Sequence, residues 1–285
     1  MNLSPLDWLS LAAILMIGLP HGAFDAAIYA LVPAKDKTHI PKKSKSRNTA
    51  RLLSFLISYI AVAVLVVYLW IALPVLSLVA FLAFSCFHFG KADSAAITGK
   101  IRIAAIISHG GLVTILIPLF HPEATSDFFE ALSGPYAKDI ITFMPVMGVI
   151  WALSFGLYAK QSFKDHAARP FISEVFLLAF AMAFLPVLPA FALYFCGVHS
   201  RRHFITLYQE FKQSRPQSVL PMAMGLTFAS WFAAAIGIWA LMPYLGIVIA
   251  AIQIIFIGLA ALTVPHMILV DGLWRPLAIQ RANKP

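Results

Sequence analysis

Charged residues are scarce in this chain of 285 residues. Asp, Glu, Lys and Arg together make up 12% of it, against about 25% in soluble domains, and hydrophobic residues make up 61%. This composition excludes an ordinary water-soluble domain and predicts an integral membrane protein. Cysteine is also rare: only Cys86 and Cys196 are present, both in apolar segments. We interpret them as small core residues, because two such cysteines imply no disulfide framework.

The N-terminus lacks the basic segment and the small-residue cleavage site that are typical of a secretory signal peptide. Long linkers and low-complexity stretches are lacking too. We therefore expect a single integral membrane domain over residues 1–285.

Apolar runs near the ~20 residues that a membrane-spanning helix needs recur along the chain. They predict an all-α polytopic bundle of about nine transmembrane helices, with eight to ten as the possible range. The expected spans are 8–31, 52–73, 75–90, 103–120, 140–159, 171–185, 190–211, 219–242 and 244–270. Pro20, between Gly18 and Gly22, predicts an interruption of the first span. Residues 121–139 are expected to form a polar, acidic loop.

Positive charge is strongly one-sided in this topology. Lys and Arg fall in alternate loops, beginning with the basic loop 35–51, whereas the other side holds Lys138 alone. Loops rich in Lys and Arg stay in the cytoplasm. We therefore expect the N-terminus outside and the C-terminus in the cytoplasm, in the plasma or inner membrane. The net charge of +9 then follows from topology, and no nucleic-acid partner is needed.

Histidines stand out within the apolar segments. His199 and His203 are four residues apart, a spacing that stacks both imidazoles on one helix face and makes them a candidate for half a metal site. The alternative is one core histidine with its hydrogen bonds satisfied and a second histidine nearby by chance. The predicted topology puts six histidines in the cytoplasmic half of their spans: His21, His88, His109, His199, His203 and His266. Ionisable residues inside a membrane indicate a functional site by default. Ligation by nitrogen alone suits iron, zinc or copper.

Acidic residues accompany these histidines. Asp25 follows His21 by four residues, Asp93 follows His88 by five, and Asp271 follows His266 by five. Metal-bound histidines usually donate their other nitrogen to a carboxylate, so these acids are candidates to stand behind the ligands. For Asp93 and Asp271 the alternative is that they simply end their helices at the membrane interface. One arginine of the pair Arg201 and Arg202 is expected to pair with an acid such as Glu174 or Glu210.

Taken together, the motifs resemble a known family. They are Pro20 to Asp25, Phe87 to Gly90 with Asp93, His109 to Gly111 leading to Pro118 and His121 to Glu123, His199 to His203, and Pro265-His266 with Asp271. In this order they resemble the Brp/Blh family of bacterial and archaeal membrane beta-carotene dioxygenases, which make retinal for rhodopsins. The resemblance extends from Pro20 to Asp271.

The resemblance implies oxidative cleavage of the central double bond of beta-carotene by O2 at a non-haem Fe(II) site. The implied metal ligands and catalytic residues are His21, His88, His199 and His203. Asp25, Asp93, His109, His266 and Asp271 are candidates to lie behind the ligands or in the pocket. The implied partners are beta-carotene, O2, membrane lipid and, functionally, a retinal-binding rhodopsin. The motifs identify no substrate-lining residue.

His88 and His109 compete for one place in this ligand set. By depth in the membrane, His109 is the better neighbour for His199 and His203. The resemblance favours His88, and Gly90 beside it would let the chain approach the site closely. We therefore rank His88 as the ligand and His109 as a residue of the pocket or behind the ligands.

Three other kinds of membrane protein would leave different signals in the sequence. A membrane di-iron desaturase or hydroxylase would carry about eight histidines in several clustered motifs, whereas this chain has a single His-x3-His pair. A haem cytochrome would place axial histidines on facing helices. A transporter would use broken helices such as the one expected at Pro20. Another histidine-metal oxidase or desaturase is the main alternative, and a transporter is a weaker one.

Overall fold

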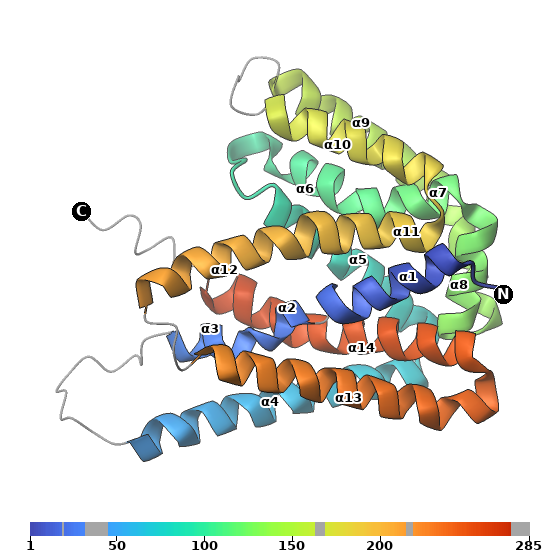
Figure 1. The fold of residues 1–285 in the computed structure, drawn as a ribbon. Helices are drawn as coiled ribbons and strands as arrows, with labels where there is room; N and C mark the ends of the chain where they lie inside the picture. Colours follow the sequence, from blue (N-terminus) through green and yellow to red (C-terminus); the bar gives the residue numbers. More distant parts are fainter. Residues whose placement is uncertain (19, 32–44, 163–168, 215–218, 275–285) are drawn as a thin grey trace.

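The computed structural model describes residues 1–18, 20–31, 45–162, 169–214 and 219–274. Within these ranges the regular structure is entirely helical (Figure 1). The first elements are α1 (Pro5–Ala13), η1 (Ile14–Gly18), α2 (Pro20–Ala23), α3 (Asp25–Leu31), α4 (Lys45–Ala72) and α5 (Pro74–Asp93). The middle elements are η2 (Gly99–Ile101), α6 (Arg102–Gly111), η3 (Leu112–Leu116), α7 (Ile117–Phe120), α8 (Pro122–Ser133), η4 (Pro135–Phe143) and α9 (Met144–Ser162). The last elements are α10 (Arg169–Phe184), α11 (Val187–Ala192), η5 (Leu193–Ser200), α12 (Arg201–Ser214), α13 (Val219–Leu245), α14 (Ile247–Leu269) and η7 (Val270–Trp274).

Six helical segments in the described part are long and apolar enough to cross a membrane. They are Thr49–Ala72, Pro74–Asp93, Gly99–Phe120, Pro135–Ser162, Pro221–Leu245 and Ile247–Gly272. The all-helical membrane class is as expected, and the six correspond to six of the nine predicted spans. The other three predicted spans fall on shorter or interrupted helices. The expected break near Pro20 is present, because η1, α2 and α3 are separate elements.

The prediction of a loop over residues 121–139 is wrong. Residues 122–133 form α8, and η4 follows it. Thr125, Phe129 and Leu132 are buried on one face of α8, a spacing that stabilises an amphipathic helix. The acids that suggested a loop lie on its exposed side. At its C-terminal end, the Trp70 indole donates to the Leu132 carbonyl at 3.0 Å, which partners a carbonyl left unpaired by the helix end.

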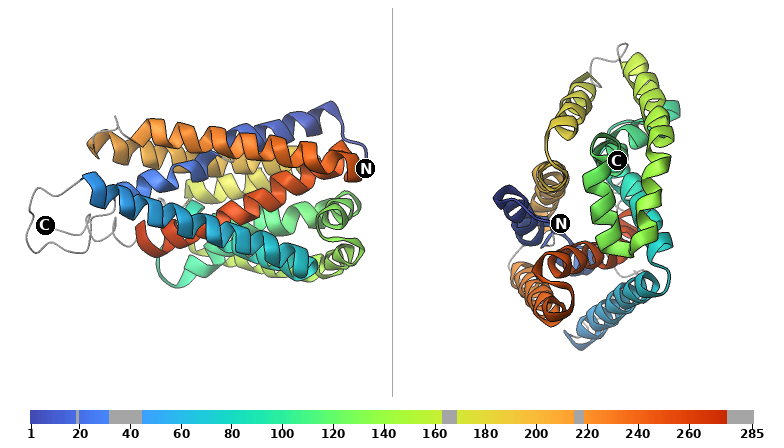
Figure 2. Two further views of the ribbon diagram at one scale, coloured as in Figure 1. Left: turned by 90° about the horizontal axis from the view of Figure 1, so that it is seen from below. Right: turned by 90° about the vertical axis from the view of Figure 1, so that its right-hand side faces the viewer.

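The helices differ in how deeply they are buried within the bundle. Over an 18-residue apolar window, 72% of the residues are buried in the segment that contains α6, whereas 0% and 6% are buried in those that contain α4 and α13. Figure 2 shows α4 and α13 on the periphery of the bundle. Large apolar side chains such as Ile57, Tyr68, Phe232 and Trp239 are exposed on these two helices. Such a surface suits contact with lipid.

Two glycines bring α5 and α6 into backbone contact. A Cβ atom added at Gly90 would overlap the backbone of Ile106, and one added at Gly110 would overlap the backbone of Cys86. Small residues at such positions allow membrane helices to approach closely. The close approach fixes the position of α5, and with it the side chains near Gly90.

The predicted basic loop 35–51 lies largely outside the described residues. Its last part differs from the expectation, because α4 begins at Lys45 and is already helical there. The first residues of α1 and the C-terminal end of α14 lie at opposite ends of the bundle (Figures 1 and 2). This arrangement is compatible with termini on opposite sides of a membrane.

Replacing Gly90 by Ala is expected to destabilise the protein by about 1–3 kcal/mol, the usual cost of overpacking. The reason is that the added methyl group must push α5 away from Ile106. The measurement is thermal unfolding of the purified protein in detergent. Gly156→Ala is the matched control, because a Cβ atom there meets no atom within 4 Å. Equal unfolding temperatures for the two variants would refute the close-packing argument.

Candidate metal centre

Four histidines from helices that are distant in the sequence meet inside the bundle. We call His88 of α5, His199 of η5, His203 of α12 and His266 of α14 the histidine cluster. Ring centroids are 5.2 Å apart for His88 and His199, 5.3 Å for His88 and His266, and 5.2 Å for His203 and His266. His88, His199 and His266 are buried, and His203 is partly buried. Four of the six histidines singled out in the sequence are thus brought together.

The two histidines of the His199–His203 pair lie beside different members of the cluster. His199 lies in the π-helical segment η5, and His203 lies in the α-helix that follows. The ring of His199 lies next to that of His88, whereas the ring of His203 lies next to that of His266. Short π-helical segments occur often at functional sites. Here the segment lies at the point where the two imidazoles must face different helices.

Carboxylates face the Nδ1 atoms of three members of the cluster. Asp25 Oδ1 lies 2.7 Å from Nδ1 of His266. The distance is 3.3 Å from Asp271 Oδ2 to Nδ1 of His88 and 3.6 Å from Asp93 Oδ2 to Nδ1 of His199. A carboxylate on Nδ1 fixes the ring orientation and leaves Nε2 as the ligating nitrogen, as in many metal sites.

Each of these carboxylates is held by a further group. The Tyr59 hydroxyl donates to Asp25 Oδ2 at 2.8 Å and also contacts the Leu262 carbonyl at 3.0 Å. The Lys91 ammonium lies 3.6 Å from Asp271. Asp93 accepts a 2.7 Å hydrogen bond from Tyr194. Buried carboxylates are costly without such partners, so these groups stabilise the acids that orient the imidazoles.

Arg202 also contributes to this network. Its guanidinium lies 3.4 Å from Asp93 Oδ1 and is paired with Glu174. Glu174 is one of the two acids that the sequence offered as partners for the arginine pair. The charge on Asp93 is therefore compensated from the α12 side, while Tyr194 contacts it from η5.

The pairing of acids with histidines differs from the one that sequence proximity indicated. Asp25 faces His266, Asp93 faces His199 rather than His88, and Asp271 faces His88 rather than His266. Each of these acids approaches its histidine from an element that is distant in the sequence. Asp93 and Asp271 are thus more than polar helix ends. The roles of Tyr59 and Tyr194 were missed, although a tyrosine inside an apolar run is a usable signal.

His109 lies apart from the cluster. It is fully buried on α6, and its ring centroid is 5.9 Å from that of Tyr158. Neither of its ring nitrogens has a hydrogen-bond partner among the described residues. The ring contacts that join the cluster run through His88 and not through His109. Of the two, His88 is therefore the one whose ring lies beside the paired histidines.

The side chain of His21 lies outside the described residues. Its backbone belongs to α2, which packs beside α13 and α14. Asp25, four residues later, reaches His266. The chain that carries His21 therefore passes next to the cluster, although nothing is placed for the imidazole itself.

The donor set has the chemistry of a metal site. In the described part, no three His, Cys, Asp or Glu side chains already converge as a group that would hold an ion. The residue types nevertheless fit, because His88 Nε2 is buried and lacks a hydrogen-bond partner among the described residues. Such an orphaned nitrogen is costly unless something binds it. Imidazole ligands of this kind suit iron, zinc or copper.

The fold and the cluster define a class: a polytopic helical membrane protein with a buried histidine site. Residues 12–274 match the model of the family described as Beta-carotene 15,15'-dioxygenase. The chain is 35% identical over 282 residues to Beta-carotene 15,15'-dioxygenase of Uncultured marine bacterium 66A03, covering 97% of each chain. No solved structure matches. The chain belongs to the Beta-carotene 15,15'-dioxygenase family and is an enzyme, an oxygenase.

Replacing Asp25 by Asn is expected to weaken metal binding by about 10–100-fold, the usual cost of losing the group behind a ligating histidine. The reason is that Asn cannot hold His266 Nδ1 with a full negative charge. The measurement is metal content per chain after dialysis against graded chelator. Asp127→Asn is the control, because Asp127 is an exposed residue of α8.

Unfolding of the metal-free proteins separates this role from a structural one. Lower stability of the metal-free Asp25→Asn variant, with unchanged metal affinity, would show that Asp25 only packs the helices together.

Proposed function

We propose that this protein cleaves the central double bond of beta-carotene with O2 and releases two molecules of retinal. The reaction would take place at Fe(II) held by histidines inside the membrane. The observation that carries the proposal is the histidine cluster with its carboxylates on Nδ1. The curated relative, whose name specifies beta-carotene, supports the choice of substrate.

His21, His88, His199 and His203 are the proposed ligands. The buried Nε2 of His88 and the position of its ring beside His199 support His88 rather than His109. His266 is a further candidate. Its Nδ1 is engaged by Asp25, and its ring lies beside those of His88 and His203. These contacts support a ligand role for His266. They are also consistent with the role that the sequence predicted, in which His266 supports the ligands or lines the pocket.

The balance of the reaction needs no additional reductant. One carbon–carbon double bond and one O2 molecule give two aldehydes, with one oxygen atom in each. Bound Fe(II) would supply the redox chemistry that allows O2 to react with an alkene. The protein's own task is to hold neutral imidazoles in fixed orientations, which the three aspartates support. No proton has to be added to or removed from the hydrocarbon substrate.

The surroundings of the cluster suit an apolar substrate. The ring centroid of Phe89 is 4.6 Å from that of His199, and the ring of Phe195 stacks on His199 at 6.2 Å. Beta-carotene has no polar group, so burial of hydrocarbon surface at ~25 cal/mol per Å2 would dominate its binding. We propose that the substrate enters from lipid and that retinal leaves through the membrane toward a retinal-binding rhodopsin.

Purified protein reconstituted with Fe(II) is expected to convert beta-carotene to retinal and to hold about one iron per chain, because the cluster forms a single site. Iron analysis and chromatography of the products measure these two quantities. His199→Ala is expected to lose most of the iron and the retinal. Full retinal formation by that variant would disprove the histidine-iron proposal.

His88 and His109 are distinguished by the same assay. His88→Ala is expected to empty the site, whereas His109→Ala is expected to lose ~10–100-fold in affinity or activity at most. The two variants can be compared directly, because both histidines are buried on packed helices of the same bundle. An empty site in His109→Ala together with a loaded site in His88→Ala would reverse the assignment.

We also propose that the N-terminus is outside and the C-terminus is in the cytoplasm of the plasma or inner membrane. In a background with Cys86 and Cys196 replaced by Ala, Glu123→Cys is expected to react in intact cells with a membrane-impermeant thiol reagent. Lys100→Cys is expected to react only after lysis, because the positively charged loops would be cytoplasmic. Both positions are exposed in the structure. The opposite labelling pattern would invert the topology.

A further inference from the structure

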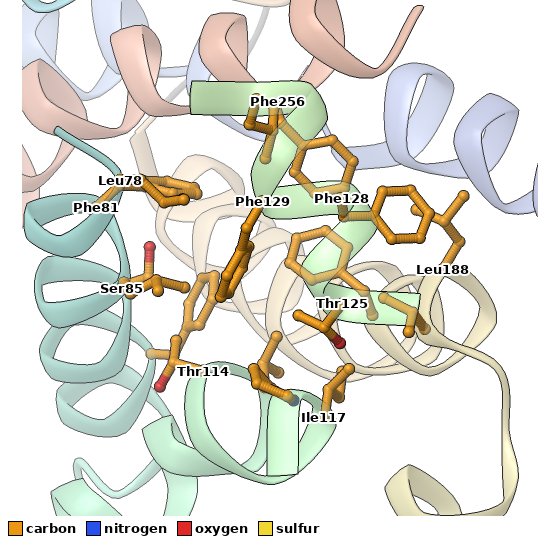
Figure 3. Close-up of a pocket in the computed structure, with 17 residues that line it drawn as sticks. Leu78, Phe81, Ser85, Thr114, Ile117, Thr125, Phe128, Phe129, Leu188 and Phe256 are labelled. Carbon is orange, nitrogen blue, oxygen red and sulfur yellow. The ribbon is translucent and has the colours of Figure 1, made fainter. Parts of the chain in front are cut away.

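An apolar cavity adjoins the histidine cluster between α5, η3, α8 and α11 (Figure 3). The empty space between its lining atoms is about 660 Å3, a figure that includes open space at its mouth. Its wall is almost entirely hydrocarbon. Among the polar side chains of the wall, the Thr114 hydroxyl donates a hydrogen bond to the Gly110 carbonyl at 3.1 Å. The cavity is therefore built for an apolar occupant.

Aromatic side chains connect the cavity to the histidine cluster. Phe89 lines the cavity, and its ring centroid lies 4.6 Å from that of His199. Phe191 also lines the cavity and packs against Phe195 at 5.4 Å, and Phe195 stacks on His199. One layer of aromatic rings therefore separates the cavity from the cluster, and a substrate that occupies both would have to displace these rings.

The cavity has a defined length along α5. Five residues of α5 line it on one helix face: Leu78, Phe81, Leu82, Ser85 and Phe89. The distance from Leu78 to Phe89 is 11 residues, or roughly 16 Å at ~1.5 Å per residue. This length is comparable with that of one retinal half of beta-carotene. Leu132 of α8 lines the cavity too, and its carbonyl is anchored by Trp70.

We propose that this cavity binds one half of the carotenoid substrate. The ring would lie at the end near Leu78 and Leu132, and the central double bond would lie past Phe89 at the histidine cluster. The length of the cavity then selects the bond that is cleaved, because a substrate half that enters fully stops at its ring. The inference rests on the proposed function, since it names the part of the molecule that holds the substrate of that reaction.

The test fills the far end of the cavity without touching the cluster. Leu78→Phe adds bulk to a buried lining residue, and Leu76→Phe adds the same bulk two residues earlier, where Leu76 is exposed on the outside of α5. Iron content, binding of beta-carotene to the iron-free protein, and products of the iron-loaded protein are measured for both. Val187→Phe, at a partly buried lining residue of α11, is the second variant in case Leu78→Phe does not fold.

Leu78→Phe is expected to keep its iron and to bind beta-carotene about 10–100-fold more weakly. Its retinal yield should fall, and an unequal pair of apocarotenals should appear, because the shortened cavity places another double bond at the cluster. Leu76→Phe should behave as the unmodified protein in every assay. Unchanged beta-carotene binding and retinal yield in both Leu78→Phe and Val187→Phe would overturn the proposal.

The two proposals fail in distinguishable ways. Retinal formation that is normal in the unmodified protein and in both cavity variants would leave the proposed function intact and remove the cavity from it. Binding of beta-carotene that is lost only in the cavity variants, with no retinal formed by the unmodified iron-loaded protein, would support the cavity and contradict the proposed reaction.

Discussion

The contacts between histidine Nδ1 atoms and aspartate carboxylates are the interactions on which the rest of this structure depends. Inside an apolar bundle an isolated carboxylate or imidazole is expensive, so each pair ties two elements together at the position of the site. His88 connects α5 to η7, His199 connects η5 to α5, and His266 connects α14 to α3. The same contacts that hold the bundle together at this level also orient the imidazoles.

Close packing elsewhere makes these pairs possible. Gly90 and Gly110 let α5 and α6 touch through their backbones, and this sets the position of His88 and Phe89 on α5. On the other side of α5, α8 covers the apolar cavity with Thr125, Phe128, Phe129 and Leu132. One helix thus carries a face toward the histidines and a face toward the space that we assign to the substrate.

Irregular helix geometry occurs where the site needs side chains from one chain segment to point in different directions. The π-helical segment η5 carries His199, and η7 carries Asp271. Near Pro20 the first apolar segment breaks into short helices, which brings Asp25 to His266. Such departures from regular α-helix cost backbone hydrogen bonds in a membrane, and here they lie inside the protein beside polar partners.

The sequence by itself determined the class and the spacing of the apolar segments, and it indicated the residue types that we assign to the site, because hydrophobicity and intramembrane histidines are local signals. It also favoured His88 over His109 through motif resemblance. The tertiary structure alone decided which acid faces which histidine. Asp93 is five residues from His88 yet faces His199, more than a hundred residues away. At about 3.6 residues per turn, a separation of five residues directs the two side chains to different faces of α5, so the partner of Asp93 comes from another helix. Helix α8 was missed for a related reason: its buried stripe gains stability only from the helices packed against it.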